Sequence, residues 1–296
     1  MSAWGHGLPS RPQWHHGRCT PESRRLTATP RSGASGQKEK LPSNADCALP
    51  DDLKLSLLST SNSAPLRARS PWRIHIGLIG GIGPAATDFY YRRLISAFAA
   101  KNRPLELTIV HADTPTLLAH LADNDPTAQI AIYKRLTDQL IAAGAGCVIV
   151  TSIAGHFCID GFKDVSPLPV VDMIAEVSAA IKKRRLKRIG ILGTRTVMET
   201  RFFGGVTSAE IVPPGHNDLD DVHDAYVTMA ASGVVTDAQR AVFTVVCQRL
   251  LNDWSVEAIM LGGTDLALVF NEQTADFPLV DCAGIHVEAI VRLAMG

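Results

Sequence analysis

The chain has 296 residues, of which 46% are hydrophobic, so it can bury the core of one large domain or two smaller ones. Its 29 basic and 29 acidic residues balance, which gives no overall field that favours binding to nucleic acid or to an anionic membrane. The longest apolar runs fall far short of the roughly 20 residues that cross a bilayer, and the six cysteines have neither metal-ligand nor disulfide-framework spacing, so we expect a cytoplasmic protein without a metal.

Residues 1–72 differ in composition from the rest. They hold 8 of the 17 prolines, 11 serines, and 10 basic against 5 acidic residues, which leaves 19 basic and 24 acidic residues in 73–296. Apart from a short apolar patch at Leu53–Leu58, they lack apolar periodicity and cannot offset the entropy of ordering. We expect a disordered segment or an upstream stretch included by a wrongly chosen start codon. The similarity to an organellar transit peptide is weak.

From residue 73 onwards, short β-rich runs alternate with helix-length amphipathic segments, the pattern of a parallel sheet covered by helices. A glycine-rich turn, Gly80–Pro84, separates the first strand from the first helix, and Gly144 suits the position just after a helix end. The predicted elements of the first half are strands at Arg73–Ile79, Leu105–Val110, Cys147–Val150 and Val170–Val171, and helices at Ala85–Ala99, Pro126–Ala143 and Ile174–Lys183.

The second half repeats this order. The segment from Arg188 echoes that from Arg73, Val256–Thr264 echoes Gly146–Ser152, and the Val-Asp pair ending at Asp281 echoes the one ending at Asp172, all at offsets close to 110 residues. The sequence therefore predicts an α/β fold with two pseudo-symmetric lobes, each with a parallel-sheet core. We expect the lobes at residues 73–186 and 187–296, a C-terminal helix returning to the first, and a ligand cleft between the carboxyl ends of the strands.

Three segments resemble the aspartate/glutamate racemase superfamily in order and spacing. They are Gly77–Thr87, with its Gly-Gly-x-Gly-Pro turn, the strand and loop Val148–His156, and Leu261–Asp265. The resemblance covers residues 73–296. It implies two pseudo-symmetric α/β lobes, no cofactor, a small amino-acid or carboxylate substrate, and proton transfer at Cα by one cysteine from each lobe. A homodimer is left open.

The catalytic positions depart from that pattern. The resemblance places Ser152 at the first cysteine, four residues before His156, and Gly263 at the second, before Thr264 and Asp265. A serine hydroxyl is a far weaker acid than a thiol and needs a neighbouring base, and glycine carries no proton at all. Symmetric exchange between two thiols at these positions is therefore excluded. Aspartate-specific members of the superfamily carry an arginine at a position that corresponds, by this resemblance, to Leu117 or a residue near it in this chain.

The candidate catalytic residues are therefore Ser152, His156 and Asp265. If the strand runs directly into a helix, Ser152 and His156 share one face and could form a proton relay; the alternative is a structural or substrate-contacting histidine. Asp265 could act as a base or orient the ligand, or it could cap a helix. Cys158 and Cys282 are further candidates, with burial in the core as the alternative.

The candidate substrate-binding residues are Gly81, Gly83, Ser152, Gly263 and Thr264, because the glycines let the backbone approach a substrate carboxylate near a helix start. The activity expected is racemase- or epimerase-type proton transfer. A one-base decarboxylase or isomerase and a non-catalytic carboxylate-binding protein remain alternatives. Gly81, Gly83 and Ala86 also fit the G-x-G-x-x-A dinucleotide fingerprint, although its usual acidic partner is missing at the expected spacing.

Overall fold

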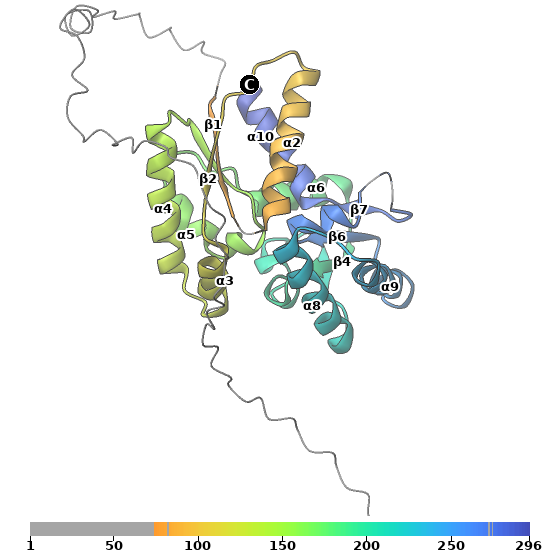
Figure 1. The fold of residues 1–296 in the computed structure, drawn as a ribbon. Coiled ribbons are helices and arrows are strands. Elements are labelled where there is room, and N and C mark those ends of the chain that lie inside the picture. The colour runs from red at the N-terminus through yellow and green to blue at the C-terminus, as the bar shows by residue number, and fades with distance from the viewer. Residues whose placement is uncertain (1–73, 82, 272, 274) are drawn as a thin grey trace, which may run out of the picture. The chain divides into compact units, whose positions relative to one another are not determined.

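Two parallel sheets organise the part of the chain that the computed structural model describes, namely residues 74–81, 83–271, 273 and 275–296 (Figure 1). The first sheet has the strand order β2-β1-β3 and the second β5-β4-β6-β7. The extension predicted for residues 1–72 lies outside the described residues. The strands are β1 (Ile76–Gly80), β2 (Leu107–His111), β3 (Cys147–Val150), β4 (Arg188–Gly193), β5 (Glu210–Val212), β6 (Ala258–Gly262) and β7 (Leu279–Val280).

The strand order is the same in both sheets. In each, the first strand along the chain lies between the second and the third. At the edge of the second sheet β7 pairs with β6, and at the matching edge of the first Val170 forms a single parallel bridge with Val148. The strand predicted at Val170–Val171 is thus reduced to one bridge. The predicted α/β class with parallel sheets is confirmed.

The central strands are buried along their whole length. Every residue of β1, β3 and β6 is buried, as expected of parallel strands that have both faces covered. The helices that cover them are α2 (Pro84–Ala100), α3 (Thr114–Ala122), α4 (Pro126–Ala142), α5 (Ile159–Val165), α6 (Met173–Arg184), α7 (Arg195–Glu199), α8 (His216–Ser232), α9 (Asp237–Asp253) and α10 (Cys282–Met295), with 3₁₀ turns η1 (Ala154–Cys158), η2 (Phe202–Gly204) and η3 (Thr264–Leu268).

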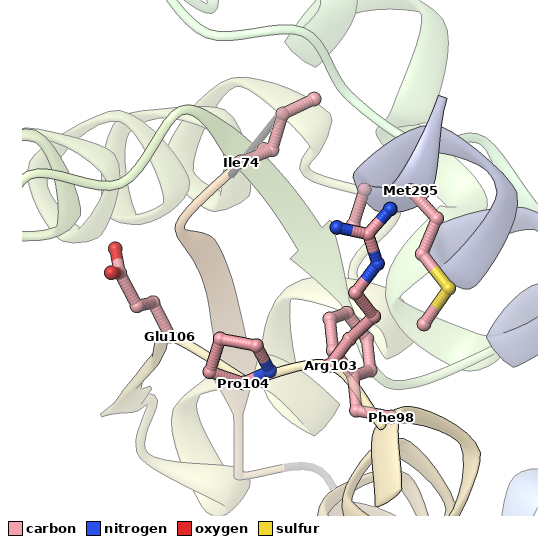
Figure 2. Close-up of a pocket in the computed structure, with 7 residues that line it drawn as sticks. Ile74, Phe98, Arg103, Pro104, Glu106 and Met295 are labelled. Atoms are coloured by element: carbon pink, nitrogen blue, oxygen red, sulfur yellow. The ribbon is translucent and has the colours of Figure 1, made fainter. Parts of the chain in front are cut away.

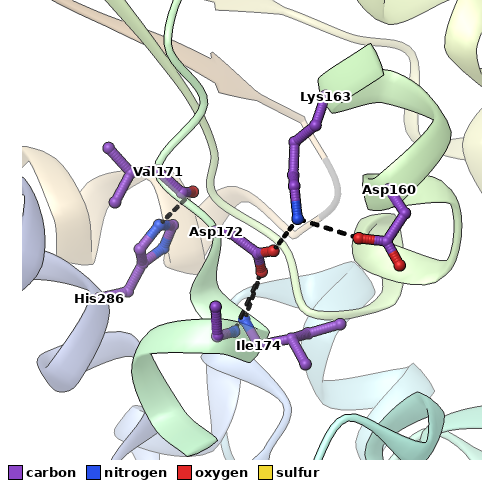
Figure 3. Close-up of polar contacts among 7 residues, drawn as sticks. Asp160, Lys163, Val171, Asp172, Ile174 and His286 are labelled. Atoms are coloured by element: carbon purple, nitrogen blue, oxygen red, sulfur yellow. Dashed lines mark hydrogen bonds and ion pairs between the residues drawn. The ribbon is translucent and has the colours of Figure 1, made fainter. Parts of the chain in front are cut away.

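The repeated Val-Asp pairs start two equivalent helices. Asp172 accepts hydrogen bonds from the Ile174 and Ala175 amides and caps α6, and Asp281 accepts one from the Gly284 amide and caps α10. Lys163 forms an ion pair with Asp172 (Figure 3). The two repeated Val-Asp segments therefore share the same local structure, in which the aspartate caps the helix that follows it.

Helix α10 packs on helices of the first half. It contacts α6 and α2, which lie beside it in Figure 1, and Arg292 pairs with Glu176 of α6 at 2.6 Å. His286 of α10 accepts a hydrogen bond at Nδ1 from the Tyr90 hydroxyl of α2, and its Nε2 donates to the Val171 carbonyl (Figure 3). These contacts fix the two sheets relative to each other.

The larger hydrophobic core runs through both sheets. It joins side chains of β1 and β3 with those of β4 and β6, through α2, α6 and α10. A second cluster fills only the other face of the first sheet, beneath α3, α4 and α5. Because the larger core is shared, the strand ends of the two sheets are held by common packing.

Candidate functional site

The first strand end carries Ser152 and His156. Ser152 follows β3 and is 5% exposed, and its hydroxyl accepts a hydrogen bond of 3.3 Å from the Gly155 amide. The His156 ring, 1% exposed, bonds through Nδ1 to the backbone carbonyl of Ser152 at 2.6 Å. The hydroxyl-to-imidazole hydrogen bond that the sequence allows as one alternative is not formed, because the 3₁₀ turn η1 directs the ring to the carbonyl of Ser152 and not to its hydroxyl.

This hydrogen bond fixes the tautomer of His156. A carbonyl oxygen only accepts, so Nδ1 carries the proton and Nε2 keeps its lone pair. Nε2 is buried without a hydrogen-bond partner in the described part of the chain, and burial lowers the pKa of the ring. His156 is thus a neutral imidazole with a free basic nitrogen. Its ring meets that of His286 edge to face, with centroids 5.9 Å apart.

The second strand end carries Gly263, Thr264 and Asp265, which follow β6. Asp265 is 2% exposed, and Thr264 is buried beside it. One oxygen of Asp265 accepts a hydrogen bond from the Ala86 amide in the first turn of α2, and the other accepts one from the Tyr226 hydroxyl of α8, both at 3.1 Å. Asp265 therefore holds an amide in the first turn of α2, a helix that is distant in the chain and whose N-cap residue is Gly83.

Burial decides the acidity of Asp265. Desolvation of the carboxylate raises its pKa to about 6, while the hydrogen bonds from Tyr226 and Ala86 act in the opposite direction. The carboxyl group therefore changes protonation state close to neutral pH, which is the range in which a general acid or base works best.

The space beside Gly263 is filled by Tyr226. A Cβ atom on Gly263 would lie 2.2 Å from Cε2 of Tyr226 and 2.6 Å from its hydroxyl oxygen. The phenol therefore occupies the position into which a side chain at residue 263 would project. Sequence reasoning missed Tyr226; the only signal was the spacing of the residues that α8 buries, Leu219, Val222, Tyr226 and Met229.

The glycines of the loop after β1 are required by packing. A Cβ on Gly81 would lie 1.9 Å from the Ala112 carbonyl oxygen, and one on Gly83 would lie 2.5 Å from an Asp265 carboxylate oxygen. Both have positive φ angles, 129° and 83°, which favour glycine. The Ala86 amide near the start of α2 is already bonded to Asp265, a carboxylate of the chain itself.

The thiols of the described residues lie in the core. Cys147, Cys158, Cys247 and Cys282 are all buried, and burial raises the pKa of Cys158 and of Cys247 to about 12. Leu117, near the position of the family arginine, is a core residue of α3. Among the described residues no group of three or more histidine, cysteine or acidic side chains is placed to hold a metal ion, and no helix is long and apolar enough to span a membrane.

Neither Ser152 nor Gly263 lines either of two pockets found in the described part of the chain. A small one of about 20 Å³ lies at the amino ends of β1 and β2, between Ile74, Arg103 and Met295 (Figure 2), and has room for little more than one water molecule. An open groove of about 1490 Å³ runs along α2 and α10, and Thr264 and Asp265 line part of it. Its volume exceeds the range usual for a small-molecule site.

Residues 79–290 match the family model described as Asp/Glu/Hydantoin racemase. This chain belongs to that family. A putative Asp/Glu racemase from Yersinia pestis is 25% identical, with a TM-score of 0.65 over 75% of this chain and 99% of that chain. An aspartate racemase homologue from Pyrococcus horikoshii OT3 is 22% identical, with a TM-score of 0.61 over the same shares. The glutamate racemase of Francisella tularensis, in complex with D-glutamate, shares the fold at 15% identity, with a TM-score of 0.54 over 75% of this chain and 81% of that chain.

Membership of the Asp/Glu/Hydantoin racemase family confirms the resemblance on which the site residues rest. Ser152 and His156 on one strand end, and Asp265 on the other, remain the predicted catalytic residues of this chain. Their side chains are between 1% and 5% exposed. The ligand cleft between the carboxyl ends of the strands stays a prediction.

Proposed function

We propose that this chain catalyses cofactor-independent proton transfer at the Cα of a small amino acid or a related carboxylate, in the cytoplasm. Ser152 and His156 serve the reaction from the end of β3, and Asp265 serves it from the end of β6. The backbone of Gly263 and Thr264, with the loop at Gly81 and Gly83, frames the substrate. Family membership supports the substrate class.

The observation that carries this proposal is the burial of Asp265. Among the described residues it is the only acidic side chain that is buried. Removing a carboxylate from water is costly, and acidic side chains are almost never fully buried unless they are paired or bonded. A buried carboxyl group with a pKa near 6, at the carboxyl end of a central strand, is typical of an acid-base site.

The first strand end supports the proposal independently. The free Nε2 of His156 is a neutral base in a dry environment, and the Ser152 hydroxyl lies on the same turn. Because the described thiols are buried in the core with raised pKa values, the oxygen and nitrogen groups are the better-suited proton carriers.

The test is deuterium incorporation at Cα of L- and D-aspartate, glutamate and alanine in D₂O, followed by NMR. The wild type is expected to exchange at least one of them without added pyridoxal phosphate, metal or nicotinamide. Asp265→Asn should lower the rate about 10²-fold or more, as for a general acid-base group. Asp138→Asn, at an exposed position of α4, is the matched control and should change nothing. Exchange that is unaltered in Asp265→Asn would remove Asp265 from the mechanism.

Gly263 favours a second candidate, the one-base reaction, because this residue cannot itself carry a proton. Under that candidate the same experiment shows deuterium incorporation with retention of configuration. Inversion of configuration supports the two-face reaction. If these compounds stabilise the folded protein but no deuterium is incorporated at Cα, only the non-catalytic, carboxylate-binding alternative is supported.

A further inference from the structure

We propose that the Tyr226 phenol is the proton carrier of the second strand end, in the place where the family resemblance puts the second cysteine. This inference rests on the proposed function and names the group that Gly263 lacks. It assigns a catalytic residue that lies outside all of the sequence motifs.

The first support is steric. The Cβ position of Gly263 falls within 2.2 to 2.6 Å of three Tyr226 atoms, Cε2, Cζ and the hydroxyl oxygen. Real Cβ atoms do not approach other atoms this closely, so a side chain on residue 263 and this placement of Tyr226 exclude each other. The Tyr226 phenol can therefore take this position only because Gly263 has no side chain.

The second support is the hydrogen bonding of the hydroxyl group. Tyr226 donates to Asp265 Oδ2 at 3.1 Å, and the other carboxylate oxygen, Oδ1, is held by the Ala86 amide. The buried carboxylate is thereby engaged at both oxygens, and its contact toward Gly263 is the phenol. Asp265 therefore acts through Tyr226.

The Tyr226 phenol and the Asp265 carboxylate together account for every proton that is transferred. When the Cα–H bond of the substrate breaks, its proton goes to the phenolic oxygen while the phenol's own proton passes to Asp265 Oδ2. The electron pair stays on Cα, delocalised into the substrate carboxylate. In the reverse direction the protonated Asp265 returns its proton to the phenol as the phenol protonates Cα. No oxidant, reductant or cofactor is needed.

The experiment compares the two enantiomers of each amino acid. Initial rates of deuterium incorporation at Cα are measured for L- and D-aspartate, glutamate and alanine with the wild type, Tyr226→Phe and Ser152→Ala. Tyr226→Phe keeps the ring that fills the space beside Gly263 and removes only the hydroxyl. Because proton carriers on opposite faces of Cα abstract from opposite enantiomers, Tyr226→Phe should slow one enantiomer at least about tenfold more than the other, and Ser152→Ala should show the reverse preference.

Tyr91→Phe is the matched control, since Tyr91 is 45% exposed on α2, and it should leave both rates unchanged. A loss of folded protein lowers both enantiomers equally and cannot mimic the expected asymmetry. Equal losses, or no loss, in Tyr226→Phe would overturn the role of Tyr226 while leaving the proposed function in place. A wild type that exchanges none of the six compounds would instead overturn the proposed function, and this role with it.

Discussion

The ends of β3 and β6 occupy equivalent places in the two sheets but obtain their functional groups differently. After β3, a single local turn supplies both Ser152 and His156, and the ring is bonded to the carbonyl of that same serine. After β6, Gly263 supplies no side chain, and the space is filled by Tyr226 from helix α8. The comparison teaches that the space beside a strand end without a side chain can be filled by a residue of another element.

The largest expected effect concerns the local turn after β3. His156→Asn keeps an N–H group near the position of Nδ1, so it can still donate to the Ser152 carbonyl, but it removes Nε2. We expect turnover to fall about 10²-fold, as in His156→Ala, because the free nitrogen is the usable base. Deuterium incorporation at Cα measures this. Near-normal turnover in His156→Asn would mean that the ring only anchors the backbone of Ser152.

The two groups of this turn should also act separately. Since the Ser152 hydroxyl and the His156 ring are not bonded to each other, the rate losses of Ser152→Ala and His156→Ala should multiply in the double variant. Residues that work as one unit give a double variant no worse than the poorer single one. Turnover of the three variants, measured at one pH, distinguishes these outcomes.

A smaller effect is expected at the other strand end, in the pH dependence of stability. The pKa of Asp265 is raised from 3.8 to about 6 in the folded protein. The stability that its proton contributes is therefore complete below pH 3.8 and is lost as the pH rises through about 6. Between pH 4 and 7 the unfolding free energy of Asp265→Asn should rise by about 2 kcal/mol relative to the wild type, at about 1.4 kcal/mol per pKa unit.

Urea unfolding of both proteins at a series of pH values checks this prediction. Asp138→Asn, with its exposed position on α4, provides the reference for a carboxylate that remains in water. A difference between Asp265→Asn and the wild type that does not vary with pH would show that the buried carboxyl group titrates in its ordinary range.

The smallest effect is expected for thiol chemistry. Alkylation of the native protein with iodoacetamide should leave turnover unchanged, because the described cysteines are buried and burial raises their pKa values. Mass spectrometry would verify that Cys147, Cys158, Cys247 and Cys282 remain unmodified. Rapid inactivation together with labelling of Cys158 or Cys282 would return a thiol to the site.

The sequence predicts the fold better than it predicts the site. Periodicity and the 110-residue offset indicate the parallel sheets, and the capping residues Asp172 and Asp281 mark equivalent helices. The sequence also singles out Ser152, His156 and Asp265 as candidates, because each of them lies in or beside a short motif that resembles the family's. Helices α8 and α9 lie between the repeated segments and were not predicted, although the apolar spacing of α8 was readable.

The remaining features depend on contacts between distant residues. Tyr226 and Asp265 are 39 residues apart, and nothing in local spacing shows that a helix residue fills the space beside Gly263. Likewise, the loop glycines suggested a ligand site, whereas Gly83 is small because the carboxylate of Asp265 packs against it. The tautomer of His156 follows from a hydrogen bond to a backbone carbonyl, which residue types alone do not reveal.

A double-mutant cycle between Gly263→Ala and Tyr226→Ala tests most directly the claim that Tyr226 occupies the side-chain space of residue 263. The cycle is read as the free energy of unfolding in urea. Gly263→Ala alone should destabilise the protein by about 1–3 kcal/mol, the usual cost of overpacking, because the added Cβ meets the phenol ring. In the Tyr226→Ala background the same change should cost almost nothing, which gives a large coupling energy. Equal costs of Gly263→Ala in both backgrounds would contradict the account.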